Sequence, residues 1–110
     1  MKKLLIALSL VSTVAHAEFM DGNELLLKLT DQSSSVARGI AFGYVAGVFD
    51  AGFGTAHCAS TSVTLKQVSD VVKIALEASP TDRHKAGDAL VMRALMVAWP
   101  CAKPKKGESM

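Results

Sequence analysis

The side chains that could carry chemistry are two cysteines and two histidines in the second half of the chain. His57 stands directly before Cys58, a possible base beside a nucleophile, but neighbours in sequence rarely present both groups to one substrate. Zinc prefers these ligand types, yet His57, Cys58, His84 and Cys101 lack the paired spacing of zinc sites. We therefore predict no catalytic residue, no metal site and no cofactor, and we expect that the protein is not an enzyme.

The N-terminus has the three parts of a secretory signal in the usual order. Lys2 and Lys3 form a charged start, residues 4–14 a short apolar stretch, and residues 15–17 a small-x-small cleavage site. The apolar stretch is shorter than the ~20 residues that a transmembrane helix needs. We predict a signal peptide at residues 1–17, a periplasmic protein, and no membrane attachment after cleavage.

Export gives the two cysteines a structural role, because paired cysteines in an oxidising compartment most often form a disulfide. A bridge between Cys58 and Cys101 would close a loop of about 44 residues, which the chain-entropy model values at roughly 3 to 4.7 kcal/mol. The sequence alone allows this bridge within one chain or between two chains. The mature chain allows one small domain, residues 18–102, and small cores need such cross-links.

The first half of that domain predicts two helices. Residues 21–23 (Asp-Gly-Asn) offer a helix start, and this helix should fade near residues 30–35. Residues 35–52 predict a second helix with three glycines on one face, namely Gly39, Gly43 and Gly47. Each mid-helix glycine costs roughly 0.5 to 1 kcal/mol against alanine, so this face implies close packing of a neighbour. We expect that neighbour within the same core; a second copy of the chain or a membrane is the alternative.

The second half predicts two more helices and no sheet. Thr64 and Gln67 form a capping box for the third helix, which should stop before Pro80. Thr81 or Asp82 can cap the fourth helix, which Pro100 stops. Its predicted apolar face consists of Ala86, Ala89, Leu90, Val97 and Ala98, and ends at Trp99. The fold class is therefore all-α, a small bundle of about four helices with one disulfide.

The polar turn between the last two helices is the main candidate for recognition, because loops on rigid scaffolds often carry binding residues. The partner-binding residues that we predict are Ser79, Thr81, Asp82, Arg83 and His84. Residues 54–57 are a secondary candidate. An ordinary solvated turn is the alternative interpretation of residues 79–84.

Charge argues against nucleic acid as a partner. Lys2 and Lys3 account for two of the 12 basic residues, so the mature chain carries ten basic against ten acidic residues. The only basic run is Lys103, Lys105 and Lys106, which lies in a short segment with proline and glycine. We predict that residues 103–110 form a disordered tail.

The order of motifs resembles the Tai-type immunity proteins, the periplasmic antitoxins of type VI secretion amidase effectors. Residues 43–50 (GYVAGVFD) are followed by Cys58, a capped helix to Pro80, and the closing Trp-Pro-Cys of residues 99–101. The resemblance covers roughly residues 21–101. The Gly-Tyr block and the closing aromatic-Pro-Cys are distinctive in combination.

The resemblance implies a small helical protein, often a homodimer, that binds and occludes a peptidoglycan amidase. The family pattern tends to have another cysteine pair, which is missing here at residues 29–31 and 40–42. From the resemblance as a whole we expect a cognate cell-wall amidase effector as the partner. A general periplasmic stress or assembly factor, such as a small helical chaperone, is the alternative; it would protect many unrelated clients.

Overall fold

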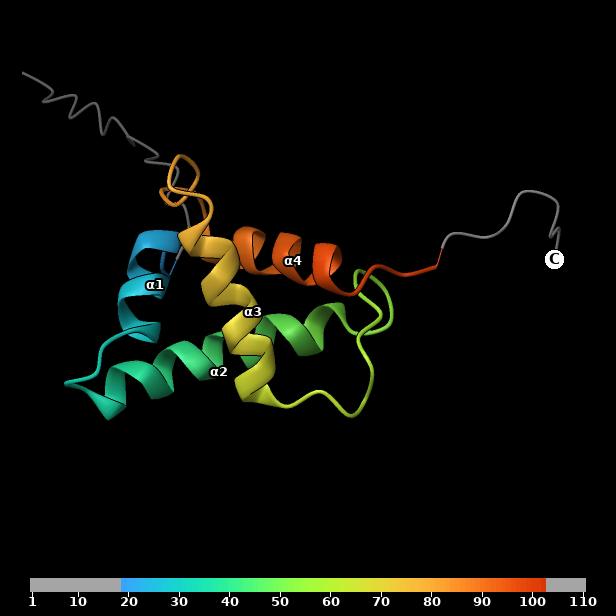
Figure 1. Ribbon diagram of the computed structural model, residues 1–110, viewed down its shortest axis with the longest axis horizontal. Coiled ribbons are helices and arrows are strands. Elements are labelled where there is room, and N and C mark those ends of the chain that lie inside the picture. The colour runs from blue at the N-terminus through green and yellow to red at the C-terminus, as the bar shows by residue number, and fades with distance from the viewer. Residues whose placement is uncertain (1–18, 103–110) are drawn as a thin grey trace, which may run out of the picture.

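Four helices form the domain in this computed structural model, which describes residues 19–102. They are α1 (Gly22–Leu29), α2 (Ser35–Gly52), α3 (Leu65–Glu77) and α4 (Gly87–Ala98). Within the described range the only β pairing consists of two isolated bridges, so the predicted all-α fold is confirmed. Figure 1 shows α3 crossing over α2, with α1 at one end of the molecule. The predicted signal peptide and the predicted tail lie outside the described residues.

Side-chain caps start the first three helices. The side chains of Asp21, Ser34 and Thr64 each accept a hydrogen bond from the backbone N–H three residues later, at 2.8, 3.0 and 3.1 Å. Each bond pairs one of the amides that a helix start leaves without an intrahelical partner. The predicted helix start at residues 21–23 and the predicted cap at Thr64 are both confirmed.

The start of α4 differs from the prediction. Its N-cap is Ala86, which has no side chain to accept a hydrogen bond. The Gly87 N–H instead donates to the Met20 carbonyl at 3.0 Å, so the segment before α1 satisfies this amide. The prediction that Thr81 or Asp82 caps the last helix is therefore wrong.

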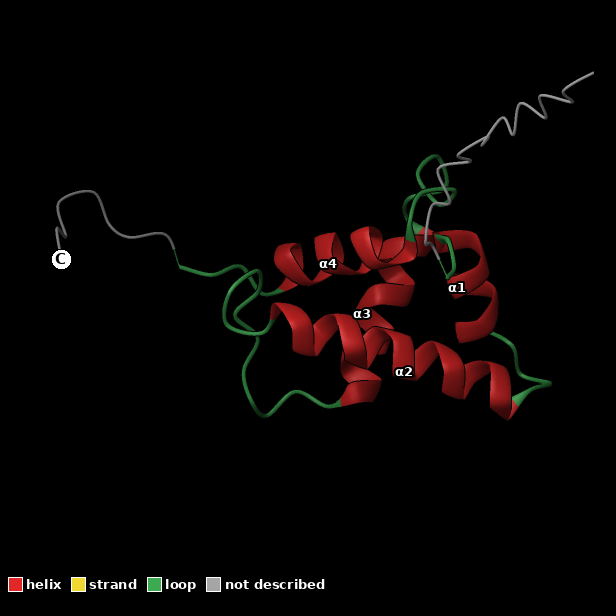
Figure 2. Ribbon diagram, turned by 180° about the vertical axis from the view of Figure 1, so that it is seen from behind, coloured by secondary structure: helices red, strands yellow, loops and turns green. Residues whose placement is uncertain are grey.

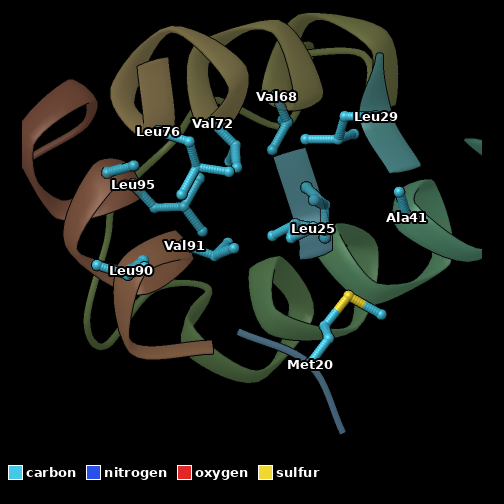
Figure 3. Close-up of a cluster of buried hydrophobic side chains, with 12 residues drawn as sticks. Met20, Leu25, Leu29, Ala41, Val68, Val72, Leu76, Leu90, Val91 and Leu95 are labelled. Atoms are coloured by element: carbon cyan, nitrogen blue, oxygen red, sulfur yellow. The ribbon is translucent and has the colours of Figure 1, made fainter. Parts of the chain in front are cut away.

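The core draws fully buried side chains from every helix. Leu25 of α1, Val45 of α2, Val72 of α3 and Leu95 of α4 are completely inaccessible to solvent. Figure 3 shows Leu25, Val72 and Leu95 converging with Val91 in the space between the helices. Burying each such side chain contributes about 1.5–3 kcal/mol, so this cluster holds the bundle together.

The buried face of α4 also differs from the predicted one. Its buried side chains are Leu90, Val91, Ala94 and Leu95. Ala89, Val97 and Ala98, which were predicted to face the core, are exposed. Apolar residues lie on most sides of this helix, so the helical period alone is compatible with more than one buried face. The packing of α4 against α2 and α3 determines which face is buried.

The glycines of α2 do not pack inside the domain. A Cβ built at Gly39, Gly43 or Gly47 would meet no atom within 4 Å. The core side of α2 is the opposite one, where Ala41 and Val45 are buried. The expectation of close packing within the same core is therefore wrong. We name this exposed strip the α2 glycine face, and it consists of Val36, Gly39, Ile40, Gly43 and Gly47. None of the four described helices has the length and apolarity to cross a membrane.

The disulfide joins Cys58 and Cys101 within one chain, with an S–S distance of 2.01 Å. The Cys58 N–H also donates to the Trp99 carbonyl at 2.9 Å. The bridge therefore pins the end of α4 to the α2–α3 loop, as the order of the cysteines predicted. In Figures 1 and 2 this loop and the α3–α4 turn lie at opposite ends of the molecule.

Candidate partner-binding surface

The α3–α4 turn is fastened to the start of α1 by backbone hydrogen bonds. The Gly22 N–H donates to the Lys85 carbonyl at 3.1 Å, and the Asn23 N–H donates to the Arg83 carbonyl at 2.9 Å. Bonds within the turn add to this, including Asp82 N–H to the Ser79 carbonyl at 3.1 Å. The turn is thus a fixed part of the fold, although few of its side chains are buried.

Gly22 makes this close approach possible. A Cβ at this position would collide with Leu90 Cδ1 and would lie 2.8 Å from the Arg83 carbonyl oxygen. Gly87 is equally confined, because its Cβ would lie 2.9 Å from the Met20 carbonyl oxygen. The two glycines allow the backbones of α1, the turn and α4 to meet.

Asp82 is committed to contacts within the chain. Its carboxylate lies 3.2 Å from Lys85 Nζ and 3.3 Å from Arg93 Nη2. The hydrogen bond from Lys85, the charge of Lys85 and the contacts with Arg93 hold the pKa of Asp82 below its ordinary value. Asp82 therefore fastens the turn to α4 and is less available to a partner than its place in the sequence suggested.

Arg83 has unused hydrogen-bonding capacity. Its side chain is half-buried, and its Nε is buried without a hydrogen-bond partner among the described residues. A buried donor without a partner carries a desolvation cost of about 1–3 kcal/mol. An acceptor brought by another molecule would offset that cost.

The other predicted residues separate into two groups. Thr81 and His84 are exposed at the tip of the turn. Ser79 is half-buried and lines a groove between α3 and α4. Of the predicted residues, only Ser79 lines this groove, which the sequence did not indicate.

This α3–α4 groove has a volume of about 320 Å³ and a largely apolar lining. Ile74 of α3 and Val97 of α4 lie in its walls, and 65% and 77% of their surfaces are exposed. Arg93 lines the same groove. As the candidate partner-binding surface we take the exposed groove residues Ile74 and Val97 together with the turn residues Ser79, Thr81, Arg83 and His84, of which Ser79 lines the groove.

Sequence reasoning missed Ile74 and misplaced Val97. Ile74 lies off the spacing of Val68, Val72 and Leu76, which form the buried side of α3. The signal that could have identified Ile74 was therefore an apolar residue outside the spacing of the buried side of α3, because such a residue is expected to be exposed. Val97 lacked such a signal, because its spacing matched the predicted inner face of α4.

The secondary candidate, residues 54–57, is only partly accessible. His57 is fully buried, and its ring lies 4.4 Å from that of Phe49 and 5.8 Å from that of Phe53, centroid to centroid. Gly54 and Thr55 remain exposed. The expectation that His57 offers a surface contact is corrected: the side chain supports the loop from inside.

The disulfide occupies both sulfur atoms, so Cys58 offers no thiolate to act as a nucleophile or metal ligand. Across residues 19–102, no three His, Cys, Asp or Glu side chains are grouped so that they could hold a metal ion. The described surface does offer a largely apolar groove between α3 and α4.

Two comparisons bear on the identity of the chain. No curated protein matches its sequence. The family model of the Rap1a immunity proteins matches residues 21–101, which is nearly the whole described domain and the range of the resemblance seen in the sequence. The chain therefore belongs to the Rap1a immunity protein family.

Proposed function

We propose that this protein is a periplasmic immunity protein that inhibits a peptidoglycan amidase effector of type VI secretion by steric occlusion. An immunity protein binds the effector against which it protects, so the family supports a protein partner. The amidase class follows from the resemblance of residues 43–50 and 99–101 to the Tai-type proteins. Steric occlusion requires a surface that fits the effector, and it does not require a catalytic group on this chain.

The observation that carries this proposal is the fixed position of the α3–α4 turn. Backbone bonds from Gly22 and Asn23 hold the turn before any partner arrives. A surface that is already ordered loses less conformational freedom on binding, and that loss is one of the main costs of association. A rigid projection beside a groove is suited to entering or covering the cleft of an enzyme.

The composition of the partner-binding surface supports the same role. Ile74 and Val97 supply exposed apolar area, while Arg83 and His84 offer polar side chains on the turn that follows α3. Protein interfaces combine an apolar centre with a polar rim, and arginine is frequent among the residues that dominate binding energy.

The first test is capture of the partner by the mature chain from the periplasmic fraction of the producing cells, followed by mass spectrometry. We expect one cell-wall amidase at near-equal molar amounts. Retention of many unrelated proteins would support the chaperone alternative instead. Recovery of an effector of another enzymatic class would keep the immunity role and reject the amidase assignment.

Paired variants then test the surface itself. Ile74→Asp places a charge in the α3–α4 groove, and Leu27→Asp places one on α1 at a position of similar exposure, 65% against 69%. We expect Ile74→Asp to weaken binding of the captured effector by about 30-fold or more, the effect of losing a dominant contact. Leu27→Asp should leave binding unchanged. Equal affinities of both variants would reject this surface.

The inhibition mechanism has its own readout. If the protein occludes the active site, the complex should fail to cleave purified peptidoglycan while the effector fold stays intact. An effector that binds the protein and still cleaves peptidoglycan at its full rate would contradict steric occlusion.

We also propose that two copies associate through the α2 glycine face. Gly43 and Gly47 allow a helix to approach closely, and Val36 and Ile40 are 71% and 50% exposed beside them. Close approach of two such faces would bury the apolar side chains that each copy exposes. Light scattering should give the mass of a dimer at micromolar concentration, and Gly43→Leu should give a monomer. A monomer mass for the unaltered protein would reject the dimer.

A further inference from the structure

We propose that a second groove, between α2 and α3, binds a small monoanionic carboxylate that carries a short aliphatic body. This α2–α3 groove has a volume of about 600 Å³, within the usual range of small-molecule sites. It shares no lining residue with the α3–α4 groove, so the inference is independent of the proposed immunity function. The side chains that line the groove include Leu29, Arg38, Phe42, Leu65 and Ser69.

The apolar part of the lining comes from three helices. Leu29 ends α1 and is buried, Phe42 of α2 is half-buried against the core, and Leu65 at the start of α3 is 45% exposed. These side chains can cover an aliphatic chain of a few carbons. Removing that chain from water would favour binding in proportion to the apolar area covered.

Ser69 supplies the first polar feature. Only 2% of this residue is exposed, it lines the α2–α3 groove, and its Oγ has no hydrogen-bond partner among the described residues. A helical serine often donates to the carbonyl four residues earlier, but no such bond forms here. A ligand oxygen would give this hydroxyl an acceptor and offset the cost of leaving it unpaired.

Arg38 supplies the positive charge. Its Nη1 donates to the Asp31 carbonyl at 2.6 Å, which fixes the guanidinium and leaves its other N–H donors for a ligand. Arg38 forms no ion pair within the described part of the chain, although the pKa of Asp31 is lowered first by hydrogen bonds from Ser33 at 2.6 and 2.9 Å and also by the charge of Arg38. Guanidinium groups bind carboxylates through two parallel hydrogen bonds, so a carboxylate suits this site.

The remaining charges of the groove favour a single negative charge on the ligand. Lys66 lies 3.0 Å from the Asp70 carboxylate, and Lys73 lies 3.8 Å from that of Glu77. These lysines are already paired along α3, whereas Arg38 is not. A ligand with two negative charges would find only Arg38 free to pair with, and its second charge would be repelled by the Asp70 carboxylate. The groove therefore matches a ligand with one negative charge.

The test uses hexanoate as the probe and hexanamide as its uncharged counterpart, each titrated into ¹⁵N-labelled mature protein and followed by NMR. We expect saturable shifts of the Arg38, Phe42 and Ser69 amide signals with hexanoate, and binding of hexanamide weaker by about tenfold, because a hydrogen bond to a charged group is lost. Shifts that rise linearly without saturation, or equal binding of the two probes, would overturn the proposal.

Variants assign the effect to the groove. Arg38→Gln should weaken hexanoate binding by about tenfold, and Ser69→Ala by about fivefold. Lys85→Gln removes one positive charge from an exposed site outside the α2–α3 groove and should leave binding unchanged. If Arg38→Gln does not fold, Ser69→Ala still decides; unchanged affinity of a folded Ser69→Ala, or an equal loss in Lys85→Gln, would overturn the assignment.

One further arm distinguishes the sources of such a carboxylate. The capped tripeptide acetyl-Leu-Glu-Leu-amide presents the same group on a peptide, and its Gln form is the control. Preference for hexanoate would identify a free acid as the ligand, and preference for the Glu peptide would identify a protein side chain. Both support carboxylate recognition, while no saturable binding of either probe rejects it.

Discussion

Arg93 on α4 holds the α3–α4 turn through Asp82, with Nη2 3.3 Å from the carboxylate oxygen Oδ2. Lys85 binds the other oxygen at 3.2 Å. The pKa of Asp82 is lowered from 3.8, first by the hydrogen bond from Lys85 and then by the charges of Lys85 and Arg93. Because the folded-state pKa is the lower one, these contacts stabilise the fold above pH 3.8. Their contribution is lost as the pH falls through the folded-state value.

Asp82→Asn should therefore lower the melting temperature at pH 7 by a small amount, since solvent screens an exposed pair. The difference from the unaltered protein should shrink as the pH falls below 3.8 and vanish once the pH lies well below the lowered pKa of Asp82, where both forms are neutral at this position. Thermal unfolding followed by circular dichroism measures this. Asp50→Asn, an exposed position on α2 outside any described ion pair, is the control. A difference for Asp82→Asn that does not shrink as the pH falls from 7 to below 3.8 would contradict the prediction.

Alanine should have opposite effects at two glycines of the bundle. Gly22→Ala forces a Cβ against Leu90 and the Arg83 carbonyl, and we expect a loss of roughly 1–3 kcal/mol in the free energy of unfolding. Gly43→Ala meets no atom within 4 Å and should raise the free energy of unfolding of the monomer by about 0.5–1 kcal/mol. Urea unfolding of both variants at low protein concentration checks the signs. Stabilisation by Gly22→Ala would mean that α1 can move away from the turn at little cost.

Local signals in the sequence were sufficient for much of the fold. Asp21 and Thr64 cap helices where their residue types and spacing indicated, because a cap depends on neighbours within three residues. The disulfide was predicted from the expected signal peptide and from the number of cysteines. These features need no knowledge of how distant segments meet.

Features that depend on distant contacts were not predictable in this way. The Gly87 amide is satisfied by Met20, a residue far away in the sequence, so no local pattern marked the start of α4. The α2 glycines suggested a close neighbour but did not say whether that neighbour belonged to the same chain. Likewise, the polar turn was identifiable from residues 79–84, whereas the groove beside it exists only once α3 packs against α4.

Loss of the disulfide should destabilise the domain without changing its helices. A loop with a sequence separation of 43 corresponds to about 4 kcal/mol in the chain-entropy model. We expect the Cys58→Ser, Cys101→Ser double variant to unfold at a clearly lower urea concentration and to retain the helical circular dichroism spectrum while folded. Reduction of the unaltered protein should reproduce this loss. A double variant as stable as the oxidised protein would show that the backbone bond between Cys58 and Trp99 is sufficient to hold the loop.

His57 and His84 should respond differently to the same substitution. His57 Nε2 donates to the Phe49 carbonyl of α2 at 2.8 Å, and Nδ1 accepts from the Ala59 N–H of the α2–α3 loop at 3.3 Å, so both ring nitrogens are paired. His57→Ala leaves a cavity and two backbone groups without partners, and we expect a loss of roughly 3 kcal/mol in the free energy of unfolding.

His84 is exposed at the tip of the α3–α4 turn, so His84→Ala should change the free energy of unfolding by less than about 0.5 kcal/mol. In the proposed function it should nevertheless weaken binding of the effector, whereas His57→Ala should reduce the amount of folded protein and leave the affinity of the folded fraction intact. Urea unfolding and calorimetric titration of the effector separate these two effects. A stability loss at His84 equal to that at His57 would mean that the turn is held by this side chain and not by its backbone bonds to α1.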